Sequence, residues 1–312
     1  MNRRQFTKLI SVSGVGLCFS TSLQAHAKSH QVAITMDDFN WSANPIKLDG
    51  AERNRAILTT LRSKGVKAAL FVRASNIVED DGKNLLKVWD DEGHLIGNHT
   101  FSHLYYHNAK VTPETFSQDI VRAEDLLKSF PHFQKIFRFP YLKEGDTVAK
   151  RDAIRQFLSQ RGYRVGHVTI DTSDWIVDDR LRKRLAKDES ADLSGYRQFY
   201  LDHMWERALY YDELSQKVVK RSVKHTILMH FNLLNALFLG DLVDMFRSKG
   251  WQVIDAVEAF RDPVFLAQPK IVPAGESIIW ALAKETGRFD KVLRYPGEDG
   301  EYETSKMDKL GL

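Results

Sequence analysis

Short apolar runs with strand propensity recur along the chain from residue 31 onward, and stretches with helical periodicity separate them. Seven of these runs predict strands, at 31–36, 66–72, 94–97, 135–139, 163–170, 225–230 and 251–255. The intervening stretches predict helices at 51–64, 83–92, 112–129, 147–161 and 232–249. This alternation is typical of a parallel α/β barrel or an open parallel sheet.

The predicted helices carry start and stop signals. Thr112 followed by Pro113 is an N-cap with proline in the first helical turn. Four helices are followed by a glycine, which takes the left-handed conformation without a Cβ penalty: Gly65, Gly93, Gly162 and Gly250. These signals support the predicted order of elements.

Two segments interrupt the alternation. Residues 176–224 are charged and aromatic, and they predict a helical insert before the sixth strand. Residues 262–312 follow the seventh strand, contain four prolines and predict one helix at 275–286. We therefore expect one domain at residues 28–261, which includes the insert, and a C-terminal extension at 262–312 packed on that domain.

The composition excludes several classes of protein. The 312 residues include 18 Phe, 10 Tyr and 6 Trp, which are too many large rings for a disordered chain. A single cysteine excludes an intramolecular disulfide framework and a four-cysteine zinc module. The formal charge is only +4, from 45 basic and 41 acidic residues, so we expect no nucleic-acid partner.

The first 27 residues have the pattern of an export signal. A basic start with Arg3-Arg4 precedes an apolar run at 9–23, and Ala25-His26-Ala27 is an Ala-x-Ala cleavage signature. The adjacent arginines resemble a twin-arginine signal, and a Sec signal is the alternative. The apolar run is too short and too polar for a stable membrane span. We expect the bacterial export machinery to deliver the mature chain, starting at Lys28, to the periplasm or the exterior.

Residues suited to catalysis follow the carboxyl ends of five predicted strands, where functional residues of such folds collect. In chain order they are Asp37-Asp38, His99 with His103, Arg138, the run 171–175, and His230. Alone, an Asp-Asp pair is ordinary turn material and a spaced histidine pair is often structural. Their joint placement at successive strand ends predicts one functional site.

This group has the composition of a site for metal-assisted hydrolysis. Two imidazoles one helical turn apart face the same way, and a carboxylate completes three protein ligands, which leaves one position open for water. A second carboxylate can act as a base, and a nearby cation keeps it ionised. A histidine beside an aspartate can protonate a leaving group. The predicted reaction is hydrolysis of an amide or an ester.

The five motifs together resemble the polysaccharide deacetylase family, the NodB-type homology domain of carbohydrate esterases. They occur in the order Thr35-Met36-Asp37-Asp38, His99-Thr100-Phe101-Ser102-His103, Arg138-Phe139-Pro140-Tyr141, Asp171-Thr172-Ser173-Asp174-Trp175 and Leu228-Met229-His230. The resemblance covers about residues 31–260. It implies a distorted seven-stranded (β/α) barrel, in agreement with the seven predicted strands.

The resemblance also implies a metal centre and its base. Asp38, His99 and His103 would hold one divalent metal ion, expected to be Zn²⁺. Asp37 would be the general base, and Arg138 would orient it.

The remaining motif residues would act on the substrate. His230 would be the general acid, tuned by Asp174. Tyr141 would offer its backbone N–H to the oxyanion, and Trp175 and Leu228 would enclose the acetyl methyl group.

Two positions depart from the family pattern. Phe39 stands where the first motif normally continues with glycine, and Leu142 follows Tyr141 where the third motif has glycine. A bulky residue at 39 predicts a narrower or reshaped sugar-binding edge near Asp37.

The leading functional hypothesis is an exported metal-dependent deacetylase that releases acetate from an acetylated glycan or oligosaccharide, with N-acetyl groups favoured over O-acetyl groups. A second hypothesis keeps the site but assigns it a small non-sugar amide. A third is a non-catalytic glycan-binding module, which predicts loss of the base, the acid or the metal ligands. All of these residues are present in the sequence.

Overall fold

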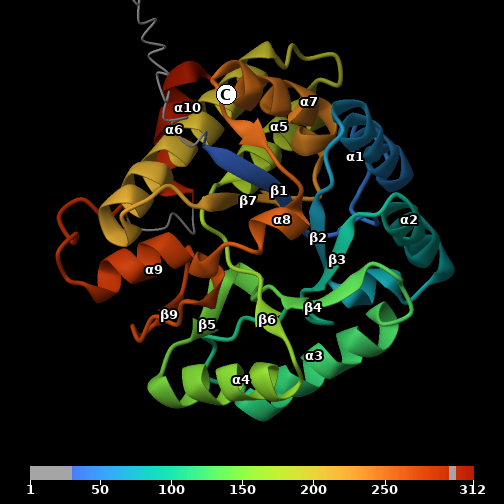
Figure 1. Ribbon diagram of the computed structural model, residues 1–312. Coiled ribbons are helices and arrows are strands. Elements are labelled where there is room, and N and C mark those ends of the chain that lie inside the picture. Colours follow the sequence, from blue (N-terminus) through green and yellow to red (C-terminus); the bar gives the residue numbers. More distant parts are fainter. Residues whose placement is uncertain (1–29, 295–299) are drawn as a thin grey trace, which may run out of the picture.

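The computed structural model describes residues 30–294 and 300–312, and a curled parallel sheet lies at its centre (Figure 1). The seven strands are β1 (Gln31–Asp38), β2 (Ala69–Val72), β3 (Leu95–Asn98), β4 (Phe133–Phe137), β6 (Arg164–Val165), β7 (Lys224–His230) and β8 (Gln252–Val253). Their order is β6-β4-β3-β2-β1-β7, and β8 pairs with the start of β1. All pairings in this sheet are parallel, so the carboxyl ends of the strands meet on one side.

β1 has paired strands on both sides and is buried along most of its length. Its residues 32–37 are buried, as expected for a parallel strand that is covered on both faces. It pairs with β7 on one side and with β2 on the other. In the register with β7, Asp37 lies directly opposite His230, so neighbouring strands bring two of the motifs together.

The segment 164–170 closes the sheet. It pairs with β4 at Arg164–Val165, and Ile170 then forms a bridge with Ile227 of β7. The Leu228 N–H donates to the Ile170 carbonyl at 3.0 Å. The predicted strand at 163–170 is therefore interrupted, because the segment crosses from one neighbour to the other. The predicted distorted (β/α) barrel is confirmed.

Five predicted helices surround the sheet, with boundaries a few residues from the predicted ones. They are α1 (Gly50–Lys64), α2 (Asp80–Asp91), α3 (Pro113–Leu127), α4 (Val148–Gln160) and α7 (Leu233–Ser248). The capping signals act as expected, since the Thr112 side chain accepts from the Thr115 N–H and Gly65 ends α1 at φ 62°. Short elements complete this part of the chain: 3-10 helices at Ala74–Ile77, Pro140–Leu142 and Pro263–Leu266, and α8 (Ala256–Ala259).

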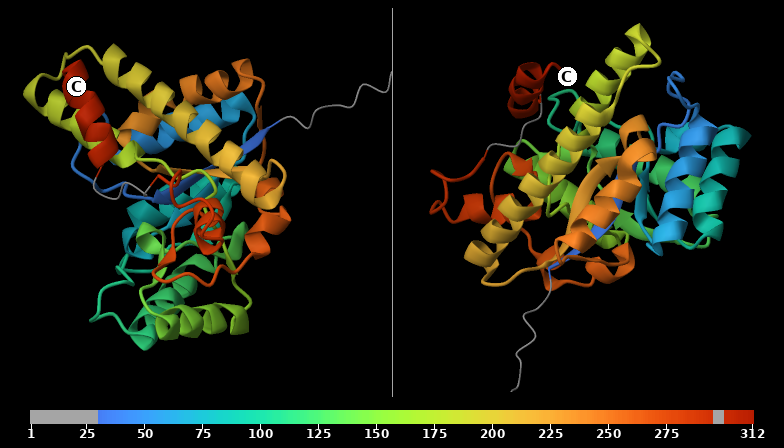
Figure 2. Two further views of the ribbon diagram at one scale, coloured as in Figure 1. Left: turned by 90° about the vertical axis from the view of Figure 1, so that its left-hand side faces the viewer. Right: turned by 90° about the horizontal axis from the view of Figure 1, so that it is seen from above.

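The insert is helical, as predicted, and consists of α5 (Asp174–Lys187) and α6 (Ser194–Val219). The long α6 runs beside α7 on the outside of the sheet (Figure 2). Tyr200 and Tyr211 are buried, and the Trp205 ring packs edge-on against Trp251 with centroids 5.7 Å apart. The aromatic residues of the insert therefore serve mainly as core.

The C-terminal extension is bound to the barrel along much of its length. Its strand β9 (Ala274–Gly275) pairs antiparallel with β5 (Lys143–Gly145), α9 (Ile278–Glu285) packs on α6, and α10 (Glu301–Leu310) contacts α5. The Arg155 guanidinium donates to the Pro269 carbonyl at 2.9 Å. These contacts place the extension beside the third and fourth motifs.

The predicted export segment, residues 1–27, lies outside the described residues. Within the described ranges, no helix combines the length and the apolar character that crossing a bilayer requires.

Truncating a core residue of the extension tests whether it shares the core of the domain. Ile279 on α9 is fully buried in the main hydrophobic cluster. Ile279→Ala should lower the free energy of unfolding by about 2–5 kcal/mol in a single urea transition. Lys284→Ala, on an exposed position of the same helix, is the control. A loss for Ile279→Ala below about 0.5 kcal/mol, the range of surface changes, would show that the extension unfolds independently.

Candidate active site

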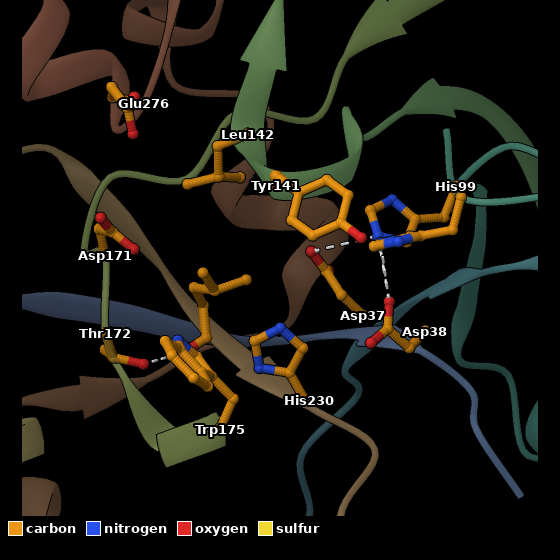
Figure 3. Close-up of a pocket in the computed structure, with 12 residues that line it drawn as sticks. Asp37, Asp38, His99, Tyr141, Leu142, Asp171, Thr172, Trp175, His230 and Glu276 are labelled. Atoms are coloured by element: carbon orange, nitrogen blue, oxygen red, sulfur yellow. Dashed lines mark hydrogen bonds and ion pairs between the residues drawn. The ribbon is translucent and has the colours of Figure 1, made fainter. Parts of the chain in front are cut away.

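The carboxyl ends of the strands surround a pocket of about 400 Å³ (Figure 3). All five sequence motifs contribute to its lining. Twelve of the described residues line it: Asp37, Asp38, His99, His103, Tyr141, Leu142, Asp171, Thr172, Trp175, Leu228, His230 and Glu276. Arg138 and Asp174 lie behind this lining, where Arg138 contacts Asp37 and His99, and Asp174 contacts His230.

Three of the lining side chains form a cluster with the donor set of a metal site. One ligand atom from each of Asp38, His99 and His103 lies within 4.8 Å of the other two. The Asp38 Oδ1 is 3.4 Å from the His99 Nε2 and 3.2 Å from the His103 Nε2, and this buried oxygen has no hydrogen-bond partner. One carboxylate and two imidazoles with an unsatisfied inward oxygen fit a zinc-type cation and leave a coordination position open.

The two histidines lie on a loop rather than on the helical turn that their spacing suggested. Thr100 and His103 have left-handed backbone at φ 64° and φ 62°. Asp119 of α3 holds this loop by accepting hydrogen bonds from the Phe101 and Ser102 N–H groups at 3.1 and 2.8 Å. The two rings still face the same cluster, with centroids 4.9 Å apart.

The orientation of His99 is set by its second nitrogen. Its Nδ1 lies 2.8 Å from the Arg138 carbonyl, which can only accept, so Nδ1 carries the proton. The Nε2 lone pair then points toward Asp38. This arrangement is the usual one for metal-ligating histidines.

Asp37 lies beside the metal cluster, with its Oδ2 3.9 Å from the His99 Nε2, and Arg138 holds its carboxylate. The Arg138 Nη1 donates to both carboxylate oxygens of Asp37, at 3.1 and 3.2 Å, and both side chains are buried. Arg138 is itself fixed by donating to Thr35 Oγ1 and to the Gly166 carbonyl, and its guanidinium lies over the Phe71 ring. The Asp37 carboxylate is therefore oriented beside the cluster while its charge is balanced.

His230 and Asp174 form a second charged pair. The His230 Nδ1 is 2.7 Å from Asp174 Oδ1, and the backbone N–H of His230 donates to the other carboxylate oxygen at 2.9 Å. Burial lowers the pKa of His230, but the charge and hydrogen bond of Asp174, with the charges of Asp38 and Asp37, raise it to about 10. The imidazole thus keeps its proton at neutral pH. Asn232 and Asn235 donate to Asp174 and fix it in turn.

The predicted substrate-contacting residues also meet at this pocket. Tyr141 has left-handed backbone at φ 56°, and its half-exposed ring lies 4.6 Å from the His103 ring. Trp175 lies on the same side of the pocket as His230 (Figure 3), and Leu228 also lines the pocket.

Four lining residues were not among the predicted site residues: Leu142, Asp171, Thr172 and Glu276. Asp171 and Thr172 belong to the fifth-strand motif, so the sequence did contain a signal for them. Leu142 follows Tyr141 directly. Glu276 lies in the extension, and no motif or periodicity pointed to it.

Residues 176–224 of the helical insert also support the site, although none of them lines the pocket. His203 and Arg207 of α6 hold the turn before α5. The Ser173 N–H donates to His203 Nε2 at 3.0 Å, and Arg207 Nε donates to the Asp171 carbonyl at 2.9 Å. Asp174 follows this turn, so the insert fixes the backbone from which Asp174 reaches His230.

Phe39 does not narrow the pocket as expected. Its side chain is fully buried and packs edge-on against Phe231, with centroids 5.1 Å apart. Asp38 and Phe39 have left-handed backbone, at φ 77° and φ 53°, which turns the Phe39 ring into the core. Asn76 fixes this turn by donating to the carbonyls of both residues at 3.1 Å.

Comparison with known proteins agrees with this geometry. The polysaccharide deacetylase family matches residues 24–166, which confirms the resemblance predicted from the motifs. A peptidoglycan-N-acetylglucosamine deacetylase of Bacillus cereus is 29% identical over 146 residues, covering 46% of each chain. A chitin deacetylase of Arthroderma benhamiae is 25% identical over 160 residues, covering 50% of this chain and 38% of that one. The chain thus aligns with less than half the length of these curated relatives.

Solved structures share the fold. A CE4 family pseudoenzyme from Bacillus anthracis superposes with a TM-score of 0.51 at 16% identity, covering 75% of this chain and 66% of that chain. A Streptococcus mutans CE4 esterase gives a TM-score of 0.50 at 19% identity, covering 73% and 86%. Both likenesses agree with the closed parallel barrel described above.

The pairing of Asp174 with His230 predicts a measurable change in the proton affinity of the imidazole. Asp174→Asn removes the charge that raises the pKa of His230, so burial dominates and the pKa falls. His230 should hold its proton about 10–1,000-fold less tightly, and the alkaline limb of any activity that needs His230 protonated should move to lower pH. NMR titration of the imidazole measures this, with Asp179→Asn on the same helix as the control. An unchanged titration would contradict the assignment.

Proposed function

We propose that this chain, whose residues 24–166 match the polysaccharide deacetylase family, is a metal-dependent hydrolase that removes N-acetyl groups from a glycan and releases acetate. The observation that carries the proposal is the convergence of the five motifs on one pocket. A three-residue metal cluster, a carboxylate held by arginine and a protonated histidine line the same cavity. A non-catalytic binding module would not need all three.

Asp38, His99 and His103 would hold the cation. When bound, it would act as a Lewis acid on the acetyl carbonyl and lower the pKa of water in the pocket. The donor set favours zinc, because imidazole and carboxylate ligands in a three-residue set with an open position are typical of catalytic zinc.

The two remaining charged groups divide the proton transfers between them. Asp37 accepts a proton from the attacking water, because Arg138 holds its carboxylate in place beside the metal cluster. His230 starts protonated and donates to the amide nitrogen as the C–N bond breaks, so the amine leaves as a neutral group. Asp174 keeps that imidazole charged and oriented.

The other lining residues would bind the acyl group. The Tyr141 N–H would donate to the oxyanion that forms at the acetyl carbonyl, and the left-handed backbone at this residue sets the direction of the N–H. Trp175 and Leu228 would enclose the acetyl methyl group. An apolar enclosure of this kind favours acetyl over charged acyl groups.

A polymeric substrate is supported by the surroundings of the pocket. Tyr141 and Tyr105 are exposed and contact each other edge-on, so the pocket is flanked by an open aromatic surface. Residues 176–224, the predicted insert, contribute no lining residue, which disfavours a closed pit for a small amide beneath them. The bacterial relative named above acts on peptidoglycan, so we propose N-acetylated cell-wall glycan as the substrate, reached after export.

Acetate release tests this function. The mature protein should release acetate from N-acetylated peptidoglycan or from N-acetylglucosamine oligosaccharides more readily than from an O-acetylated glycan. Chelation should abolish the release, and a divalent ion added back should restore it. Full activity after exhaustive chelation, with no metal by elemental analysis, would refute metal dependence. Acetate release from small amides alone would favour the second hypothesis.

The two adjacent aspartates should behave differently. Asp37→Asn keeps the size of the side chain but removes its basicity, so kcat should fall about 10²–10⁴-fold while bound metal and KM change little. Asp38→Asn should instead weaken metal binding, with activity partly recovered in excess metal. Elemental analysis beside kcat distinguishes them. Loss of metal in Asp37→Asn with retention in Asp38→Asn would reverse the two roles.

A further inference from the structure

The C-terminal extension contributes Glu276 to the pocket. The Glu276 N–H donates to the Leu142 carbonyl at 2.9 Å, which fixes the extension beside the loop that carries Tyr141. The Glu276 side chain is 12% exposed and forms an ion pair with the buried Lys143. In Figure 3 it lies at the end of the pocket remote from Asp38 and His99.

Asp171 lies at the same end of the pocket. Its backbone is fixed because the carbonyl accepts from Arg207 Nε at 2.9 Å. No side chain among the described residues donates a hydrogen bond to its carboxylate, which borders the pocket. The carboxylates of Glu276 and Asp171 thus form one wall of the pocket, and different neighbours hold each of these two residues in place. Neither takes part in the proton transfers proposed above.

The charge of this wall is nearly balanced from behind. Lys143 forms the ion pair with Glu276, and Arg207, which donates to the Asp171 carbonyl, brings a second positive charge behind the wall. The wall therefore presents hydrogen-bond acceptors without a large net charge. Neutral hydroxyl groups are the donors that suit such a wall, whereas an ammonium group would need uncompensated carboxylates.

One continuous cavity of about 400 Å³ joins this wall to the metal cluster. A cavity of this size encloses a whole small-molecule ligand, which is far more than an acetyl group needs. Leu142, Leu228 and the Trp175 ring form apolar surfaces along it. A sugar ring offers apolar faces and hydroxyl edges, and this pocket matches both.

We propose that Glu276 and Asp171 form a hydroxyl-binding subsite that orients the acetylated sugar unit, so that the C-terminal extension determines substrate specificity. The proposal rests on the deacetylase function proposed above. The two carboxylates accept hydrogen bonds from neighbouring sugar hydroxyls, and no covalent step involves them.

Calorimetric binding of an N-acetylglucosamine oligosaccharide tests the subsite directly. Glu276→Gln keeps the size of the side chain and an acceptor for Lys143 but removes the charge-assisted acceptor. The affinity for the oligosaccharide should fall about 10–100-fold, and KM should rise more than kcat falls. Affinity for acetate, which has no hydroxyl group, should be unchanged. If Glu276→Gln is destabilised, Glu276→Asp serves as a second variant. Because it retains the carboxylate, it should bind the oligosaccharide more tightly than Glu276→Gln.

Glu285→Gln is the matched control, because Glu285 is an exposed residue of the same extension outside the pocket. Undiminished oligosaccharide binding by Glu276→Gln, or equal losses for oligosaccharide and acetate, would overturn the subsite. The subsite would also be overturned if a deacetylated, amine-bearing oligosaccharide bound more tightly than the acetylated one and this preference depended on Glu276.

If the unaltered protein binds sugar through Glu276 but releases no acetate, the proposed function fails and the subsite stands. If it releases acetate while Glu276→Gln binds normally, the function stands and the subsite fails.

Discussion

The buried ion pair between Arg138 and Asp37 connects the parts of the site. The guanidinium of Arg138 holds the carboxylate proposed as the base, and its backbone carbonyl fixes the ring of a metal-cluster histidine, His99. The same side chain reaches Thr35 on β1 and the Gly166 carbonyl on the segment that closes the barrel. Removing one partner of such a buried pair typically lowers the free energy of unfolding by about 3–5 kcal/mol. Because Arg138 makes all of these contacts, the orientation of the base, the metal cluster and the closure of the barrel depend on this one residue.

Backbone strain is concentrated around the same pocket. Nine non-glycine residues in the described part of the chain have positive φ, and seven belong to the site or its adjoining turn: Asp38, Phe39, Thr100, His103, Tyr141, Leu142 and Glu276. Each such conformation costs about 1–3 kcal/mol and persists only where the surroundings determine it. At Asp38 the strain has a clear use. It lets two chemically identical neighbours, Asp37 and Asp38, point to different partners, Arg138 and the two histidines.

Much of this arrangement was predictable from the sequence, because parallel strands bring their carboxyl ends to one side. The barrel and the meeting of Asp37 with His230 follow from that rule. The features that the sequence did not predict depend on local backbone conformation. Residue spacing suggested a helical histidine pair, whereas left-handed residues and Asp119 hold a loop. The volume of Phe39 suggested a narrower edge, but the turn at Asp38 directs its ring inward. Glu276 was missed because a two-residue antiparallel strand has no periodicity to detect.

The proposed function depends on one cation held by Asp38, His99 and His103, with Asp37 beside it as an unligated base. Anomalous X-ray diffraction at the zinc edge, from crystals of the zinc-loaded protein, tests this most directly. We expect a single strong peak about 2.0–2.2 Å from one oxygen of Asp38 and one nitrogen of each histidine, with both Asp37 oxygens outside bonding distance and still paired with Arg138. A peak bonded to Asp37, or one located between Asp171 and Glu276 instead, would contradict it.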